Sequence, residues 1–278
     1  MHTHHHQDAT PSDLALAEML ELDAQVLHAY LTDLTGWLDT FTDGSTERIL
    51  DAGSGPGTGT LALADRFPRA GITAVDLSPQ MLHRLAGQAT AHGVADRVRT
   101  LQVDLDEPWP GSETGEPFDL VWSAAFWHHL QDPDRALRQA LGSLRPRGLL
   151  AITEMDFFPR FLPEDAGAGR PGLESRLHAA TNPGGGASDW SDHIDRAGFT
   201  LEAHRPVTVE LSGPPTPTVR RYARVCLTRL REHAEGELAA EDLAALDALL
   251  DDDGPLSVAH RDDMTVRTTR TTWVARRP

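Results

Sequence analysis

Residues 51–59, DAGSGPGTG, carry the clearest chemical signal in the chain because an acid and four glycines directly follow a short apolar run. Glycine has no side chain, so backbone amides there can approach a ligand closely and the chain can take positive φ. A helical pattern follows, and a helix N-terminus adds partial positive charge. The stretch therefore predicts a ligand-binding loop between a strand and a helix, built on Asp51, Gly53, Ser54, Gly55 and Gly57.

Two further acids close later apolar segments that are typical of strands, Asp76 in AVDLS and Asp104 in LQVDL. In an open parallel sheet, ligands bind at the edge where the carboxyl ends of the strands meet. The loop has the spacing G-x-G-x-G, and Thr58 stands where a dinucleotide fingerprint requires its third glycine. Asp51 directly ahead of the loop suits a cationic ligand better than a pyrophosphate.

A pair of histidines, His128 and His129, lies in SAAFWHHL after the fourth expected strand. Histidine titrates near neutral pH, so either side chain can act as a general base. A strand-end loop easily directs only one of two neighbours at a ligand, which leaves the other for packing. Glu154 and Asp156 follow the fifth expected strand at the same edge. One of them orients a histidine or holds a substrate amine, or both are solvated loop acids.

Alternating strand and helix patterns position these groups. Strands are expected over residues 48–51, 71–78, 98–105, 118–125 and 148–155, and helices over residues 58–67, 79–93 and 132–144. No short hairpin joins them, and such alternation implies a parallel sheet with helices on both faces.

The remaining segments are expected to flank this sheet. We expect a disordered tail over 1–11, cap helices over 12–43, and a main domain over 44–278 that carries a lid or insert at 156–187 and a helical insertion at 215–255. The lid offers three aromatic side chains for a substrate wall, Phe157, Phe158 and Phe161. Residues 264–277 alternate β-branched and Arg residues, which predicts a half-exposed edge strand.

The charge balance excludes several functions. The 278 residues include 42 acidic and 25 basic side chains, every one of the latter Arg, for a formal net charge of −17. A surface this acidic repels a nucleic-acid backbone, so small, fairly neutral substrates are expected. No run approaches the roughly 18–20 apolar residues of a membrane span. The single Cys226 cannot form an internal disulfide, which fits a cytoplasmic location.

The order ILDAGSGPG resembles motif I of the class I S-adenosylmethionine-dependent methyltransferases. FDLVWSAAFWHHLQDP is similar to motif IV of that family, and LRPRGLLAITEM to its hairpin and fifth strand, with Arg147 in place of the first of two usual glycines. The resemblance covers residues 48–155. It implies an α/β fold with a doubly wound, mostly parallel seven-stranded sheet, the Rossmann-like methyltransferase fold, with an N-terminal helical cap and a helical insertion before the last strand.

The resemblance also implies S-adenosylmethionine as the cofactor and methyl transfer to O, N or C of a small secondary metabolite. Asp76 would accept the ribose hydroxyls, and Asp104 with Leu105 would contact the adenine. Met81 either flanks the adenine or packs in the core. The implied cofactor-binding set is Tyr30, Asp51, Gly53, Ser54, Gly55, Gly57, Asp76, Leu77, Met81, Asp104, Leu105, Ser123 and Ala124. The implied catalytic set is His128, His129 and Glu154, with a histidine near the methyl group as general base.

Two other functions stay open. An enzyme of the same fold can bind S-adenosylmethionine and catalyse another step, such as a decarboxylation or a rearrangement. A non-catalytic binding protein can also keep the fold, although the intact acids and glycines argue against it. Asp104, Glu154 and Asp156 do not have a recognised metal-ligand spacing, so no metal site is expected.

Overall fold

The strands form because apolar side chains alternate or run continuously over short segments. In the computed structural model, which describes residues 11–109, 116–181, 189–234 and 236–278, seven strands form one sheet. They are β1 (Arg48–Ala52), β2 (Gly71–Asp76), β3 (Val98–Gln102), β4 (Phe118–Ala124), β5 (Leu144–Met155), β6 (Thr200–Leu211) and β7 (Val266–Arg276). Their order across the sheet is β3-β2-β1-β4-β5-β7-β6. The expected seven-stranded, mostly parallel sheet is confirmed.

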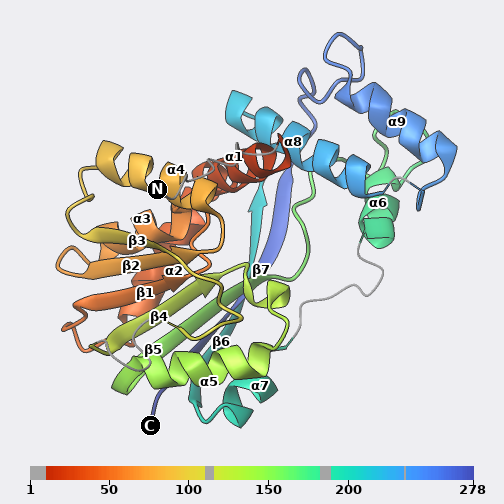
Figure 1. The fold of residues 1–278 in the computed structure, drawn as a ribbon. Helices are drawn as coiled ribbons and strands as arrows, with labels where there is room; N and C mark the ends of the chain where they lie inside the picture. Colours follow the sequence, from red (N-terminus) through yellow and green to blue (C-terminus); the bar gives the residue numbers. More distant parts are fainter. Residues whose placement is uncertain (1–10, 110–115, 182–188, 235) are drawn as a thin grey trace, which may run out of the picture.

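Helices cover both faces of this sheet because the side chains of a strand alternate between faces. On β1, Ile49 packs into one core and Leu50 into the other. The first core is covered by α2 (His28–Asp39), α3 (Thr58–Arg66) and α4 (Pro79–Ala91), and the second by α5 (Pro133–Ser143) and α7 (Ser191–Arg196). The doubly wound arrangement fixes the carboxyl ends of β1 to β5 at one edge (Figure 1).

The last strand is not the edge strand that the sequence predicts. β7 lies between β5 and β6 and runs antiparallel to both, so β6 forms the edge. The alternation of Thr and Arg in β7 indicates exposure, yet Trp273, Val274 and Ala275 are all buried. Its arginines reach partners on other elements, since Arg276 pairs with Glu202 and Arg270 with Asp23.

Four helices lie to one side of the sheet and form a cap: α1 (Pro11–Val26), α6 (Leu173–Thr181), α8 (Pro217–His233) and α9 (Ala240–Leu250). Figure 1 shows α1 and α8 side by side, with α6 and α9 beyond α8. The predicted insertion before the last strand corresponds to α8 and α9. The predicted tail falls outside the described residues except for Pro11, which begins α1.

The predicted lid is packed against the cap over its described part. Phe161 is fully buried and meets Tyr222 edge-on, with the ring centroids 5.2 Å apart. The buried carboxylate of Glu174 on α6 accepts hydrogen bonds from the backbone N–H groups of Phe161 and Leu162 at 2.9 Å. Phe161 is therefore core and not substrate wall, whereas Phe157 and Phe158 are half-buried.

A buried ion pair attaches the cap to the sheet. Arg270 on β7 donates to the Asp23 carboxylate on α1 at 2.5 Å, and the Tyr222 hydroxyl on α8 donates to the same carboxylate. The side chains of Arg270 and Asp23 are only 11% and 16% exposed. A charge this far from water is costly to leave without a partner, so these groups hold α1, α8 and β7 together.

We expect Asp23→Ala to lower the free energy of unfolding by about 3–5 kcal/mol, because it leaves the Arg270 charge buried and unpaired. Glu18→Ala is the matched control, since Glu18 also joins α1 to α8 through Arg221, but by side chains that are 36% and 53% exposed. Its expected cost is about 0–1 kcal/mol. Urea denaturation measures both, and equal costs would contradict this role of Asp23.

Candidate active site at the carboxyl edge of the sheet

The glycine loop leaves β1 and folds back onto β2. The backbone N–H groups of Gly53 and Ser54 both donate to the Val75 carbonyl at 2.9 Å. Gly53 has φ of +75°, and a Cβ there would lie 2.3 Å from Cγ of Phe126. Gly53 is therefore required both by its left-handed backbone and by the ring that rests on it.

Gly57 and Gly59 serve packing beneath the loop. A Cβ on Gly57 would lie 2.6 Å from Cγ of Leu85 on α4, and a Cβ on Gly59 would lie 2.9 Å from Nε1 of Trp122 on β4. Gly57 thus lets the loop pack closely against α4, and Gly59 lets α3 pack closely against β4. The sequence analysis did not separate this packing role of the glycines from ligand binding.

Asp51 supports the loop from below. Its carboxyl group is 2% exposed and accepts a hydrogen bond from Thr60 Oγ1 at 2.5 Å. Burial raises the pKa of Asp51 to about 7. The side chain thus fixes the start of α3 and does not face the open edge, where the sequence placed it opposite a cationic ligand.

Asp76 connects the loop to the end of β2. Its Oδ2 accepts from the Gly55 N–H and its Oδ1 from the Ser78 N–H, each at 2.8 Å. An ionised carboxylate has about four acceptor positions, so both oxygens keep capacity for a ligand. Because its two protein bonds fix its orientation, the half-buried Asp76 is a pre-oriented acceptor for a pair of hydroxyl groups.

An apolar surface flanked by acids continues from Asp76 along the edge. Leu77 is 61% exposed, unusual for a leucine that follows a buried strand. Asp104 is also exposed, and its Oδ1 accepts from the Asp106 N–H at 2.9 Å. Met81 and Leu105 are 5% and 4% exposed, so both lie in the core beneath this surface. The exposed leucine and carboxylate suit a flat heteroaromatic ring with a donor group.

Glu154 organises the turn that follows β4. This buried carboxylate accepts through Oε1 from the backbone N–H groups of Phe126 and Trp127, at 3.0 and 2.8 Å. Its Oε2 lies 2.9 Å from Nδ1 of His128. One side chain thus fixes both the backbone of the turn and the histidine that the turn presents, so the structure brings together two of the three predicted catalytic residues.

The two histidines differ in their electrostatics. The hydrogen bond that His128 donates to Glu154 raises the pKa of His128, whereas burial and the His128 charge lower the pKa of His129. Their ring centroids are 4.0 Å apart. A carboxylate only accepts, so Nδ1 of His128 carries the proton, and Nε2 of the neutral ring has a free lone pair. His128 therefore has the geometry of a general base, with 47% of its side chain exposed.

The residues just before the turn line the edge by their backbone. Ala125 has φ of +51°, a conformation rare for a residue with a Cβ, and its N–H donates to the Thr153 carbonyl at 2.8 Å. Ser123 is fully buried and donates to the Ala52 carbonyl, so its hydroxyl locks β4 to β1. Of the two predicted contacts here, only the half-buried Ala124 reaches the surface of the edge.

Tyr30 comes from α2 toward the same edge. Its hydroxyl lies 3.2 Å from Oγ1 of Thr153, which is the register partner of Ala124. The Arg270 guanidinium lies over its ring, 5.5 Å from the centroid. Tyr30 is 6% exposed, so its hydroxyl is a buried group beside the turn that carries His128.

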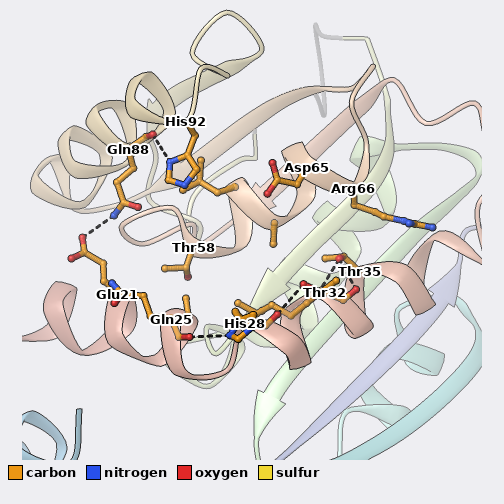
Figure 2. Close-up of a pocket in the computed structure, with 14 residues that line it drawn as sticks. Glu21, Gln25, His28, Thr32, Thr35, Thr58, Asp65, Arg66, Gln88 and His92 are labelled. Atoms are coloured by element: carbon orange, nitrogen blue, oxygen red, sulfur yellow. Dashed lines mark hydrogen bonds between the residues drawn. The ribbon is translucent and has the colours of Figure 1, made fainter. Parts of the chain in front are cut away.

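A separate groove of about 890 Å³ lies between α1 and α2 on one side and α3 and α4 on the other (Figure 2). None of the predicted site residues lines it. Several of its polar groups are already bonded: Glu21 accepts from Gln88, and Nδ1 of both His28 and His92 contacts a backbone carbonyl of its own segment. The groove therefore carries no evident chemistry.

Two negative findings apply to the described part of the chain. It holds no group of three or more His, Cys, Asp or Glu side chains arranged to hold a metal ion. None of its helices is long and apolar enough to cross a membrane.

Comparison with known proteins places this site in a family. Residues 49–148 match a methyltransferase domain family. The chain is 28% identical over 197 residues to the 27-O-demethylrifamycin SV methyltransferase of Amycolatopsis mediterranei, covering 68% of this chain and 63% of that protein. It is 36% identical over 106 residues to the release factor glutamine methyltransferase of Chlorobaculum tepidum, covering 36% of each. The chain thus spans less than two thirds of the curated relatives it matches.

Solved structures share the fold. A putative methyltransferase from Bacillus halodurans has a TM-score of 0.56 at 18% identity, over 89% of this chain and 98% of that one. Coclaurine N-methyltransferase bound to N-methylheliamine and S-adenosylhomocysteine has a TM-score of 0.52 at 16% identity, over 89% and 72%. Residues 49–148 thus form a methyltransferase domain, and with the strand order and the glycine loop this match supports a class I S-adenosylmethionine-dependent methyltransferase. The predicted family and its cofactor, S-adenosylmethionine, are confirmed.

The residues at the edge fit this cofactor. Asp76 offers two oxygens with spare acceptor capacity for ribose hydroxyls, and Leu77 offers an exposed apolar surface for adenine. In the loop, the hydroxyl of Ser54 is buried and lacks a partner among the described residues. A buried polar atom without a partner is costly, which marks Ser54 Oγ as a group that a bound ligand can satisfy.

We expect Asp76→Asn to weaken S-adenosylmethionine binding at least about tenfold, because a neutral amide makes weaker hydrogen bonds to ribose hydroxyls than a carboxylate does. Asp65→Asn on the exposed face of α3 is the matched control and should leave the affinity unchanged. Isothermal titration calorimetry measures both. Equal affinities for Asp76→Asn and wild type would remove the ribose role of Asp76.

We expect the pKa of His128 to lie above 6.5 and to fall in Glu154→Gln, because its main cause is the hydrogen bond to Glu154. The stabilisation from this pair is then present below about pH 6.5 and is lost as pH rises through the folded-state pKa of His128. NMR titration of the ring protons measures the pKa. Asp156→Asn is the control, since Asp156 is bonded to Thr271 and should not affect His128. An unchanged pKa in Glu154→Gln would contradict the pairing.

Proposed function

We propose that this protein transfers a methyl group from S-adenosylmethionine to O, N or C of a small-molecule acceptor of the secondary-metabolite type. The observation that carries this proposal is the His128–Glu154 pair, 2.9 Å apart on the turn after β4 at the cofactor edge. A histidine held by a buried carboxylate at that place is suited to remove a proton from an acceptor.

When bound, S-adenosylmethionine supplies an already activated methyl group, so the protein mainly aligns the acceptor and excludes water. Nε2 of His128 would take the proton of the acceptor hydroxyl or amine while the acceptor atom bonds to the methyl carbon, whose bond to sulfur breaks to leave S-adenosylhomocysteine. Glu154 keeps the ring in the required tautomer and stabilises the imidazolium that results. The same carboxylate accepts from the N–H groups of Phe126 and Trp127, so the His128 ring is held in a fixed position relative to the backbone of the turn.

The cofactor would lie along the edge from the glycine loop to β3. Asp76 would hold the ribose, Leu77 and Asp104 would contact the adenine, and the backbone of Gly53 and Gly55 would pass close to the amino-acid part. Tyr30 on α2 would lie beside the amino-acid part of the cofactor and would contact its carboxylate. Met81, Leu105, Asp51, Gly57 and Ser123 would act from beneath, by supporting these groups.

Several observations support a small molecule as acceptor. The cap places α1 above the loop, since a Cβ on Gly55 would lie 3.5 Å from Leu20, and such a roof leaves limited room for a macromolecule. The net charge of −17 opposes nucleic acid. The relative from Amycolatopsis is named for a rifamycin acceptor. We also propose that the protein is cytoplasmic and does not bind membranes, on the basis of its amino-acid composition.

We expect the full chain, incubated with S-adenosylmethionine and a panel of phenols, amines and hydroxy acids, to form S-adenosylhomocysteine with at least one of them. His128→Gln should lower kcat for that acceptor by about 10²–10⁴ with unchanged cofactor affinity, the usual contribution of a general base. His92→Gln, at the exposed residue that directly follows α4, is the control. Liquid chromatography with mass spectrometry measures the product.

Three results would overturn the proposal in part or in whole. Cofactor binding with conversion of an acceptor but without S-adenosylhomocysteine would indicate a different step catalysed on the same fold. Full activity of His128→Gln would place the base elsewhere or make it unnecessary. Failure to bind S-adenosylmethionine would remove the function altogether.

A further inference from the structure

Two half-buried acids of this protein lack an ion pair. Within the described residues, every half-buried aspartate or glutamate pairs with an arginine except Asp76 and Asp156. Asp76 is the residue that would hold the cofactor ribose. A carboxylate that is partly withdrawn from water is costly unless a positive charge or hydrogen bonds compensate. Asp156 is therefore a second acid at which a ligand group is expected.

The carboxylate of Asp156 accepts from one neutral hydroxyl in the described part of the chain. Thr271 Oγ1 on β7 donates to both of its oxygens, at 2.8 and 3.0 Å. A carboxylate has about four acceptor positions, so a single shared hydroxyl hydrogen orients it and leaves most of them free. Arg160, the basic residue of the same segment, instead lies over the ring of Phe157 and donates to Ser175. The negative charge of Asp156 is thus oriented but not neutralised.

Asp156 lies on the same face of the sheet as the His128–Glu154 pair. Thr271 is the register partner of Glu154, and partners directly opposite each other in an antiparallel pair project to one face. Asp156 bonds to that threonine from two positions beyond Glu154, where its N–H donates to the Thr269 carbonyl and extends the pairing of the strands. Two residues of a strand span about 7 Å. A small acceptor that contacts His128 can therefore also reach Asp156.

We propose that Asp156 binds an ammonium group of the methyl acceptor, so that the acceptor is a small organic amine that binds in its positively charged form. This inference rests on the proposed function, since it names the chemical class of that substrate. An ammonium group supplies the charge that Asp156 lacks and N–H donors for its free acceptor positions. The net charge of −17 acts in the same direction, because an acidic protein attracts cations. Asp156 determines specificity by binding and orientation, while proton transfer remains with His128.

The test compares a charged probe with a neutral one of nearly the same shape, on the full chain saturated with S-adenosylhomocysteine. Phenethylammonium chloride and phenethyl alcohol are titrated separately at constant ionic strength, and the ring-proton NMR signals of His128 report binding. The phenyl ring suits the half-buried Phe157 and Phe158 that follow Asp156. Wild type should bind the ammonium saturably and at least about tenfold more tightly than the alcohol, the gain expected from charge-assisted hydrogen bonds.

Asp156→Asn keeps an acceptor for Thr271 but removes the charge. It should bind the ammonium at least about tenfold more weakly than wild type, with unchanged affinity for the alcohol. Thr271→Val removes the protein partner and keeps the charge, so it should retain the preference for the ammonium. Asp165→Asn is the matched control, because it removes a charge from an exposed position of the same segment; it should bind both probes like wild type.

Turnover gives a second readout. With the acceptor found in the panel of phenols, amines and hydroxy acids, Asp156→Asn should raise KM about tenfold and leave kcat nearly unchanged, whereas His128→Gln lowers kcat. An acceptor without an amino group would overturn the inference. Equal affinity of wild type for the two probes, no saturable binding of the ammonium, or equal ammonium affinity in Asp156→Asn and wild type would also overturn it. A loss in Thr271→Val as large as that in Asp156→Asn would do the same, because the effect would then be structural.

Calorimetry with S-adenosylhomocysteine on the same samples separates this inference from the proposed function. If S-adenosylhomocysteine binds and the ammonium does not, only the acceptor class is wrong. If S-adenosylhomocysteine does not bind, the proposed function fails, and with it this role of Asp156.

Discussion

The buried carboxylate of Glu154 is the constraint on which the geometry of the site depends. It stands at the end of β5 and accepts from two backbone N–H groups of the turn after β4 as well as facing His128. Without Glu154, the N–H groups of Phe126 and Trp127 would lack these acceptors, and the conformation of the turn would lose its main stabilising hydrogen bonds. The strained Ala125 lies directly before these residues, so the same carboxylate compensates for an unfavourable backbone.

The buried and half-buried charged side chains of this protein fall into two groups, those that are fully bonded within the protein and those that keep free hydrogen-bonding positions. Structural charges are paired: Arg270 with Asp23 fixes the cap to the sheet, and Glu174 accepts from the backbone of the segment that enters the cap. The acid at the proposed site keeps unused capacity, as shown by the spare lone pairs of Asp76. Paired charges add rigidity, whereas charges with free capacity mark where a ligand is expected.

Much of the fold was predictable because local pattern and long-range pairing agree. Alternation of strands and helices gave the sheet, and the glycine loop with Asp76 gave the cofactor edge. The order of β6 and β7 was not predictable from their composition, because the arginines of β7 are neutralised by partners distant in sequence, Asp23 and Glu202. The burial of Phe161 was hidden for the same reason, since it packs on the distant Tyr222, whereas Asp51 lies beside a glycine loop that predicted a ligand and is instead bonded to the nearby Thr60. The pairing of Glu154 with His128 was one of several alternatives, because the two residues are 26 positions apart and only the sheet brings them together.

The most direct measurement is an NMR experiment with S-adenosylmethionine that carries a ¹³C-labelled methyl group, bound to the full chain. Nuclear Overhauser contacts from that methyl group report which protein protons lie beside it. The account predicts contacts to the ring protons of His128 and to Ala124 or Ala125, at the end of β4. Contacts confined to other parts of the molecule, such as the groove between α1 and α3, or bound cofactor without contacts to the turn that Glu154 holds, would contradict it.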